Sequence, residues 1–314
     1  MDEIREGIMM IYQLFCTVAA LFGAYFAMVS AGLAVRKKPG LPVERYMQFA
    51  VITAARNEES CIAALVESIR RQEYPEELVD IYVVVNNCTD NTAQVALDAG
   101  ARVIYASPSV RSKGQALHEA FALLMKTGDY DAYCVFDADN EASPCFLAEM
   151  NRAMQGETRA AKSRILAKNA AESWVAASYE MFFCNANVFL NTARDRIGFS
   201  ARLIGTGFAV RHDLMEELGG WNTGTLTEDA EFYAMLSERG ERIAFVPGAV
   251  AYDEEPLTFR ESLTQRRRWM SGIMEVGRRK GSDLARSMVS GKGGRFALDA
   301  LVQLAFAWVQ AAMI

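Results

Sequence analysis

The sequence predicts an α/β fold, with a mainly parallel sheet and helices on both of its faces, between two apolar ends. Strand-like and helix-like patterns alternate through the first half of the chain, as they do in doubly wound sheets. Short polar clusters follow the predicted strands, which is where such sheets bind their ligands. Each end of the chain is apolar enough to meet a membrane.

The predicted elements alternate from residue 49 to residue 136, and one further helix follows later. The strands are expected at Phe49–Ala55, Val79–Val85, Ala101–Ala106 and Asp131–Phe136. The helices are expected at Glu58–Gln72, Thr92–Ala99, Gln115–Lys126 and Glu228–Arg239. This order of strand and helix predicts a parallel sheet with crossover helices.

The N-terminal segment 1–40 is predicted to be a transmembrane anchor. Residues 8–35 carry no charge and one strongly polar side chain, Gln13. A helix of that length reaches ~42 Å, which exceeds the ~30 Å hydrocarbon core. Its acidic start and its length argue against a cleaved signal peptide. The basic residues 36–38 follow directly, so we expect the N-terminus outside and the rest in the cytoplasm. The linker is marked by Pro39, Gly40 and Pro42.

The C-terminal part is predicted to lie on the membrane and then enter it. Residues 257–295 carry ten Lys or Arg against three acidic residues, although the whole chain has a net charge of −6. This composition predicts amphipathic interfacial helices over 257–294, with a solvated helix face as the alternative. Residues 295–314 are predicted to begin a further span within which the sequence ends; the alternative is a buried amphipathic helix. The polar residues of this run are Asp299, Gln303 and Gln310.

Between these ends, residues 41–256 form the expected cytoplasmic domain of a multi-pass plasma-membrane protein. The net charge of −6 argues against a nucleic-acid binder, which needs a positive field. The six cysteines form no Cys-x-x-Cys pair, which argues against a zinc module or a disulfide framework and fits a reducing compartment. The glycine-rich phosphate loops of dinucleotide and P-loop proteins do not occur.

An acidic triplet, Asp137-Ala138-Asp139, follows the fourth predicted strand. Residues two apart in an extended chain point the same way, so Asp137 and Asp139 can present oxygen ligands to one Mg²⁺ or Mn²⁺. Such an ion keeps several waters and bridges to diphosphate oxygens. A turn after a buried strand explains the triplet equally well by itself.

A second acidic triplet, Thr227-Glu228-Asp229, opens the helix predicted at Glu228–Arg239. Ordinary helix capping by Thr227, with acids in the first turn, accounts for this triplet alone. In the functional interpretation, Asp229 is a general base that takes a proton from an attacking hydroxyl.

The third motif is Gln265-Arg266-Arg267-Arg268-Trp269. An arginine can fork two hydrogen bonds onto a phosphate, and the face of a tryptophan stacks well on a sugar ring. A basic interfacial helix with an aromatic anchor is the alternative, and the two interpretations are compatible.

In this order the motifs make the chain resemble the membrane-integrated family 2 glycosyltransferases, which include cellulose, chitin, hyaluronan and poly-N-acetylglucosamine synthases. The resemblance runs from about Phe49 to Trp269, most of the chain. Its elements are Ala54-Ala55-Arg56-Asn57-Glu58-Glu59, the stretch from Asn86 to Asp90, Lys113-Gly114-Gln115-Ala116-Leu117, Asp137-Ala138-Asp139, Gly205-Thr206-Gly207-Phe208, Thr227-Glu228-Asp229 and Gln265-x-x-Arg268-Trp269.

The resemblance implies a GT-A fold and a metal-dependent, inverting transfer from a nucleotide sugar, usually a UDP-sugar, with Mg²⁺ or Mn²⁺. On the donor side it implies that Lys113 lies near the ribose or diphosphate. Asp139 is then the direct metal ligand, with Asp137 toward the nucleotide. The uridine is held by the region of Ala55, Asn57, Glu58 and Asn86. Asn86 departs from the usual acidic residue of the family, although an amide oxygen can also accept from uracil.

On the acceptor side the resemblance makes Asp229 the base, with Glu228 beside it among the catalytic residues. Arg268 also contacts the donor, where it steadies the departing diphosphate. Trp269 forms the floor of the acceptor site, and Gln265 holds donor and acceptor in register. Residues 159–202 are expected to include helices that shape this side.

The function that the resemblance predicts is a processive or semi-processive β-glycosyltransferase that elongates a polysaccharide. A single-addition transferase acting on a lipid is the alternative among enzymes, and an inactive donor-binding membrane scaffold is the alternative outside them. The expected partners are a nucleotide-sugar donor, a saccharide or lipid-linked acceptor, the lipid bilayer, and export or partner subunits.

Overall fold

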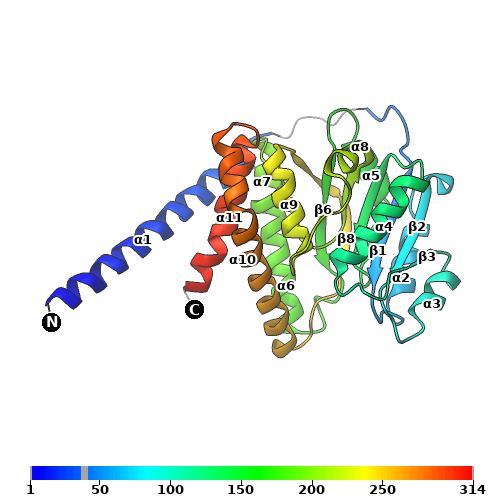
Figure 1. The fold of residues 1–314 in the computed structure, drawn as a ribbon, viewed down its shortest axis with the longest axis horizontal. Coiled ribbons are helices and arrows are strands. Elements are labelled where there is room, and N and C mark those ends of the chain that lie inside the picture. Colours follow the sequence, from blue (N-terminus) through cyan, green and yellow to red (C-terminus); the bar gives the residue numbers. More distant parts are fainter. Residues whose placement is uncertain (1, 37–41, 313–314) are drawn as a thin grey trace.

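An eight-stranded sheet lies at the centre of the computed structural model, which describes residues 2–36 and 42–312 (Figure 1). The strands lie in the order β3-β2-β1-β4-β7-β6-β8-β5, and helices cover both faces. Their bounds are β1 Phe49–Ala55, β2 Val79–Val85, β3 Arg102–Tyr105, β4 Ala132–Phe136, β5 Glu141–Ala142, β6 Ala160–Ala167, β7 Phe208–Arg211 and β8 Ile243–Asp253. The predicted α/β sheet is therefore confirmed.

The half of the sheet formed by β3-β2-β1-β4 is parallel throughout. Strands β1 and β2 have the predicted bounds, β3 is one residue shorter than predicted at each end, and β4 begins one residue later than predicted. Parallel strands are buried on both faces, so they appear in the sequence as apolar runs. The helices of this half are α2 Ile62–Arg70, α3 Thr92–Asp98 and α4 Lys113–Thr127.

Helix α2 begins later than the predicted start at Glu58, because the loop after β1 is bonded elsewhere. Asn57 has a positive φ of 60°, which a helix does not allow. The backbone N–H of Glu58 donates to Thr92 Oγ1 at 2.8 Å. The loop after β1 is thus tied to the start of α3, beside β2.

The other half of the sheet is mixed, which corrects the expectation of a mainly parallel sheet for this region. β7 is antiparallel to both β4 and β6, and β5 is antiparallel to β8, whereas β6 and β8 pair in parallel. Helices still separate most strands after β4, but the alternation no longer gives a parallel sheet, because β7 and β5 pair antiparallel with their neighbours.

Between β6 and β7 the chain forms an almost unbroken helical column. Its parts are α6 Trp174–Asn185, the π-helical η3 Ala186–Thr192 and α7 Ala193–Arg196. The helices expected within 159–202 are therefore present, after a strand that the sequence did not predict. The remaining helices of the domain are α5 Phe146–Ala153, α8 His212–Leu218 and α9 Glu228–Arg239; α9 has the predicted bounds.

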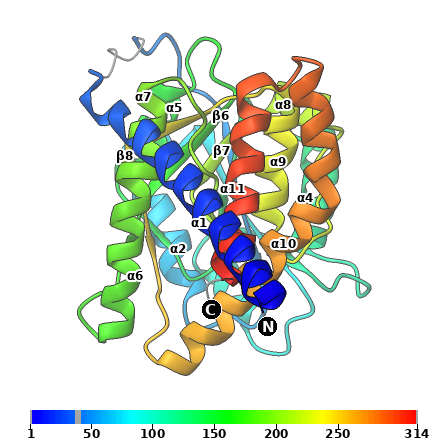
Figure 2. The same ribbon diagram turned by 90° about the vertical axis from the view of Figure 1, so that its left-hand side faces the viewer.

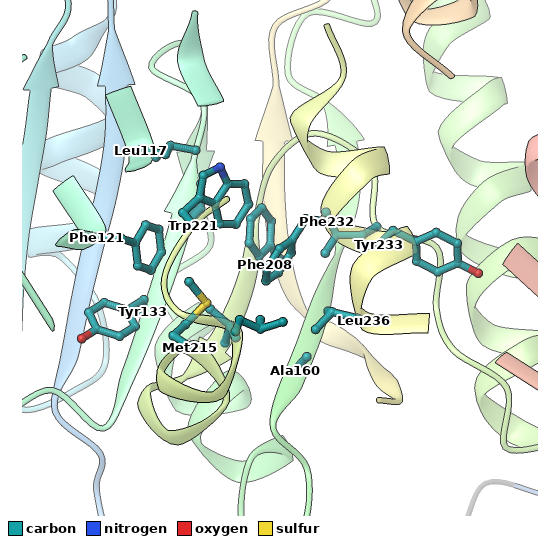
Figure 3. Close-up of a cluster of buried hydrophobic side chains, with 14 of the residues drawn as sticks. Leu117, Phe121, Tyr133, Ala160, Phe208, Met215, Trp221, Phe232, Tyr233 and Leu236 are labelled. Carbon is teal, nitrogen blue, oxygen red and sulfur yellow. The ribbon is translucent and has the colours of Figure 1, made fainter. Parts of the chain in front are cut away.

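An aromatic stack fixes α9 and α4 against the sheet (Figure 3). Trp221 is buried at its centre, with ring centroids 4.3 Å from Phe232 of α9, 5.5 Å from Phe121 of α4 and 5.9 Å from Phe208 of β7. Buried aromatic side chains contribute large apolar areas to a core. The stack thereby sets the position of the start of α9, where Asp229 lies.

Two long helices follow the sheet: α10 Phe259–Val289 and α11 Gly294–Ala312. Helix α10 begins with a capping box between Thr258 and Glu261, so one helix occupies most of the region where several interfacial helices were expected. Helix α11 packs on α10 and α9 and buries Asp299 and Gln303. That arrangement matches the alternative of a buried amphipathic helix; the further span stays a prediction.

The N-terminal helix α1 (Asp2–Ser30) continues into the short helix η1 (Ala31–Ala34) and projects from the domain (Figure 1). Within the described residues, one helical stretch, Arg5–Ala34, is long and apolar enough to cross a bilayer, with a mean hydropathy of 1.9. In Figure 2, α1 crosses in front of the space between α6 and α11. The predicted orientation rests partly on Lys37 and Lys38, which, like Pro39 and Gly40 of the linker, lie outside the described residues.

Candidate active site

A cavity of about 1560 Å³ opens at the carboxyl ends of β1, β2 and β4, next to the starts of α4 and α9 and the first turns of α10. This is the edge at which parallel sheets bind ligands. The predicted site residues that line it are Ala55, Glu58, Asn86, Lys113, Asp137, Asp139, Glu228, Asp229, Gln265, Arg268 and Trp269. The fold therefore brings together motifs from widely separated parts of the chain.

Asn57 is the one predicted site residue outside the cavity lining. Its Oδ1 accepts from the backbone N–H of Thr89 at 2.8 Å, so it holds the loops after β1 and β2 together. Asn86 is buried beneath this junction, and its Oδ1 accepts from Asn87 Nδ2 at 3.1 Å. The predicted uridine contacts of this region stay a prediction.

Lys113 links the two acidic triplets. Its Nζ forms ion pairs with Asp137 and, at 2.9 Å, with Glu228. Burial opposes the lysine charge, but the two carboxylates outweigh it and raise the pKa of Lys113 above its ordinary value. Gly114, next to Lys113, lets the start of α4 lie close to the loop before α9, because a Cβ at residue 114 would lie 2.8 Å from Thr223 Oγ1. The ammonium group of Lys113 is therefore held between the expected metal site and the start of α9.

Asp137 and Asp139 lie where β4 ends, and Thr206 Oγ1 accepts from the backbone N–H of Asp137 at 3.0 Å. Burial, together with the nearby charge of Asp137, raises the pKa of Asp139 to about 6. Within residues 2–36 and 42–312, no three His, Cys, Asp or Glu side chains converge to hold a metal ion. A divalent cation here would need further oxygen ligands, such as those of a diphosphate.

Two acidic residues that sequence reasoning missed lie at the end of β8. Asp253 Oδ1 accepts from Asn140 Nδ2 at 2.6 Å, and burial, with Glu255 and Asp139 nearby, raises the pKa of Asp253 well above its ordinary value. Burial also raises the pKa of Glu255 to about 7, and its buried Oε1 has no partner among the described residues. The available signal was an apolar run ending in acids, the same pattern that identified Asp137.

These carboxylates make the stability of the metal-free protein depend on pH. A carboxylate whose folded pKa is raised binds protons more tightly in the folded state, so stability falls as pH rises through the window between its two pKa values. For Asp139 and Glu255 that window extends from about pH 4 to about pH 7. We therefore expect the thermal unfolding temperature of the metal-free protein to decrease as the pH is raised from about 5 to about 7.

The measurement is thermal unfolding in EDTA across this range, repeated with saturating Mn²⁺ and with the variant Glu255→Gln. We expect Mn²⁺ to reduce the slope, since a cation offsets the repulsion between carboxylates, and the variant to have a smaller slope than the wild type. A midpoint that rises with pH in EDTA would contradict this account of the acidic cluster.

Lys162 of β6 is a second group that the sequence did not reveal. Its side chain is fully buried, and Nζ donates to the carbonyl oxygen of Thr206 at 2.7 Å. Burial lowers the pKa of Lys162 to about 7, although the charges of Asp253, Asp229 and Asp137 oppose the shift. A buried lysine therefore lies behind the loop that carries Gly205-Thr206-Gly207.

That loop also holds the predicted base. Asp229 Oδ2 accepts from the backbone N–H of Gly205 at 2.5 Å. Gly205 has a φ of +55°, a conformation that glycine adopts without strain. Burial and the neighbouring charge of Glu228 raise the pKa of Asp229, while the Gly205 N–H and Lys113 oppose the shift. A carboxylate with a raised pKa on a cavity wall is suited to accept a proton.

The third motif lies on α10, directly above the start of α9. A Cβ at Gly272 would lie 2.4 Å from Thr227, so glycine is what allows the two helices to approach. Trp269 packs edge-on against Tyr179 of α6 at 5.9 Å, and Arg266 lies over the same ring at 4.7 Å. Gln265 Oε1 is buried without a partner among the described residues, and the exposed Arg268 lines the cavity.

The fold and the site together define a glycosyltransferase of the GT-A type: the sheet carries an acidic pair after β4, and a carboxylate opens the helix across the cavity. The chain belongs to glycosyltransferase family 2, because the model of that family, "Glycosyltransferase like family 2", matches residues 47–272. This bears out family 2; membrane integration and the polysaccharide-synthase subtype stay predictions.

Two of the curated relatives are named for their products, one a glycolipid and the other a polysaccharide. The chain is 27% identical over 237 residues to the probable glycosyltransferase YdaM of Bacillus subtilis, covering 72% of this chain and 55% of the relative. It is 27% identical to the beta-monoglucosyldiacylglycerol synthase of a Nostoc species, covering 71% of this chain and 48% of the relative. It is 22% identical to the poly-beta-1,6-N-acetyl-D-glucosamine synthase of Staphylococcus aureus, covering 85% and 65%. The chain thus spans about half to two thirds of the length of these relatives.

Solved structures share the fold. The mannosyltransferase PcManGT from Pyrobaculum calidifontis, in complex with GDP-Man and Mn²⁺, superposes with a TM-score of 0.66 at 18% identity, covering 96% of this chain and 86% of that one. The glucosyl-3-phosphoglycerate synthase of Mycobacterium tuberculosis, in complex with UDP, gives 0.51 at 20% identity, covering 79% and 87%. These likenesses confirm the GT-A architecture.

Proposed function

We propose that this chain is the catalytic part of a metal-dependent, inverting glycosyltransferase that transfers a sugar from a UDP-sugar to an acceptor hydroxyl at a membrane. One observation carries the proposal: a single cavity is lined by the acidic pair after β4, by Asp229 and by Gln265, Arg268 and Trp269. The residues proposed to bind the donor, accept the proton and contact the acceptor therefore line one cavity.

The donor end is supported by the acidic cluster and by the structural neighbours. Asp137 and Asp139 would hold the cation: they lie together at the end of β4, and burial of Asp139 penalises its negative charge while no cation offsets it. A bound Mg²⁺ or Mn²⁺ would neutralise charge on the leaving diphosphate. Complexes of neighbours with UDP, or with GDP-Man and Mn²⁺, agree with a nucleotide-sugar donor.

The acceptor end supplies the base and orients the substrates. Asp229 would take the proton of the acceptor hydroxyl as that oxygen attacks the anomeric carbon. The new bond joins the acceptor oxygen to that carbon, while the bond from the carbon to the diphosphate breaks and UDP leaves. Arg268 would stabilise the charge on the departing diphosphate, and Trp269 would support the acceptor. A single displacement of this kind inverts the anomeric carbon.

The site chemistry serves either acceptor considered from the sequence. The S. aureus relative is named for a polysaccharide product and the Nostoc relative for a lipid one. The growing β-linked polysaccharide, the export subunits, the plasma-membrane location and the cytoplasmic orientation remain predictions. The cavity, however, has an apolar end that favours the lipid acceptor.

The experiment is an incubation of the detergent-solubilised protein with Mn²⁺ or Mg²⁺ and a panel of UDP-sugars, with UDP release and product mass read together. We expect UDP release with one donor, abolished by EDTA, and transfer of that sugar to an added acceptor. Failure of every donor to release UDP with either metal would refute the proposed function. A binding-only scaffold would give that result while still binding UDP.

A further inference from the structure

The cavity has two chemically different ends. The polar end contains the acidic pair and Asp229, as described above. The opposite wall is built from apolar side chains of four elements, α1, α6, η3 and α11. They are Phe26, Phe182, Phe183, Leu190, Leu304 and Phe306. At about 1560 Å³ the cavity also exceeds the ~300–1,000 Å³ of an ordinary small-molecule site, which leaves room for a second ligand beside a donor.

The apolar wall reaches the acceptor side of the site. Phe183 belongs to a small buried cluster with Ile165, Val175 and Tyr179, and Trp269 packs against that cluster. Next to it on α6, Phe182 is 39% exposed, with its ring centroid 5.4 Å from that of Phe183. Apolar packing through this buried cluster therefore connects Trp269 with Phe182, which lines the cavity.

The same wall continues into the candidate membrane span. Phe26 lies within Arg5–Ala34 and packs against Phe306 of α11 with ring centroids 5.0 Å apart. Only 6% of the most apolar window of this stretch is buried against the described chain, so its remaining surface is available to lipid. Figure 2 shows α1 crossing in front of the space between α6 and α11, which both contribute side chains to the wall.

Charges at this side match a membrane surface. Arg278 of α10 lies over the ring of Trp308 of α11 at 5.0 Å, and Arg295 lies over Phe296 at 5.0 Å. Arginine–aromatic pairs of this kind suit the level of lipid head groups, where one end is apolar and the other wet.

We propose that the apolar wall receives an acyl chain of a lipid acceptor, which enters from the bilayer beside α1 and presents its head-group hydroxyl to Asp229. This inference rests on the proposed function and names its acceptor class. The six apolar side chains offer no hydrogen-bond partner to saccharide hydroxyls, although Gln303 of α11 also lines the cavity. An acyl chain requires none.

The first test is a binding measurement that needs no turnover. A diacylglycerol with a diazirine near the end of one acyl chain is cross-linked to the full chain in micelles, and the modified peptides are identified by mass spectrometry. We expect adducts in peptides of α6 and η3 around Phe182 and Leu190, suppressed by excess dioleoylglycerol. Adducts confined to α1 and insensitive to competition would overturn the inference.

The second test compares neighbouring residues of α6. Phe182→Asp places a charge in the wall, whereas Met181→Asp changes a more exposed side chain outside the cavity lining. The readout is the ratio of dioleoylglycerol-dependent to acceptor-free UDP release. We expect this ratio to fall about tenfold in Phe182→Asp, since the charged side chain replaces the apolar contact with the acyl chain, and to hold in Met181→Asp.

The possible results distinguish failure of the acyl-chain inference from failure of the proposed function. Equal ratios in both variants and the wild type would overturn the inference. So would elongation of a saccharide primer that needs no lipid and is unaffected by Phe182→Asp. Absence of UDP release under every condition would instead refute the proposed function itself.

Discussion

Replacing Asp229 by asparagine is expected to lower turnover by about 10²–10⁴-fold, the usual contribution of a general base. The asparagine side chain keeps an oxygen that can accept the Gly205 N–H, now bonded at 2.5 Å, so the loop that holds residue 229 keeps its geometry. The variant loses the carboxylate that takes the proton. Affinity for UDP with Mn²⁺ is expected to stay within about twofold, because the acidic pair after β4 is unchanged.

Turnover is measured as UDP release with saturating donor, and affinity by calorimetric titration of UDP in the presence of Mn²⁺. The matched control is Glu238→Gln near the other end of α9, outside the cavity lining, which is expected to behave like the wild type. A wild-type rate in Asp229→Asn would remove Asp229 from the reaction. Lost UDP binding together with lost turnover would show that the residue acts through the donor site.

The largest expected effect on stability comes from a buried ion pair between α7 and α11. Arg194 and Asp299 pair with both side chains fully buried, and Tyr233 of α9 donates to Asp299 Oδ2 at 3.0 Å. Figure 3 shows Tyr233 pointing away from the aromatic stack. Asp299→Leu leaves the Arg194 charge buried without its partner, so we expect unfolding to become easier by about 3–5 kcal/mol.

The double variant Arg194→Met/Asp299→Leu is the control for this prediction. Because it removes both charges, its stability is expected to return close to that of the wild type or above it. Denaturant unfolding in detergent measures both variants. A loss below about 1 kcal/mol for Asp299→Leu, or a double variant less stable than the single one, would contradict the assigned role of the pair.

Tyr233 also connects this pair to the site. It stands one helical turn after Asp229 on α9, and Gln303, which lines the cavity, donates to its hydroxyl at 2.6 Å. Tyr25 of α1 donates to Asp299 as well. The N-terminal helix, α11 and the helix of the base therefore share one polar network.

The parallel half of the sheet was predictable because each of its strands is an apolar run bounded by turns. Strands β1 and β2 were predicted to the residue. The motif residues after these strands could be expected to converge, since carboxyl ends of parallel strands meet at one edge. Every predicted site residue except Asn57, which holds two loops together, lines the cavity, and the roles assigned to these residues stay predictions.

The other half of the sheet could not be predicted from local sequence patterns. β6 contains the charged Lys162 and Arg164, β7 is four residues long, and β8 is interrupted by Pro247 and Gly248. Their pairing depends on antiparallel neighbours far away in the sequence. The same holds for the Arg194–Asp299 pair and for the apolar wall of the cavity, which combine helices from both ends of the chain.

The anomeric configuration of the product tests the proposed inverting mechanism most directly. With an α-linked UDP-sugar that supports UDP release, the product is isolated and its anomeric proton coupling is measured by NMR. Single displacement with Asp229 as base predicts the large coupling of a β-linked gluco-configured sugar. The small coupling of an α-linked product would show retention and would contradict the assigned mechanism.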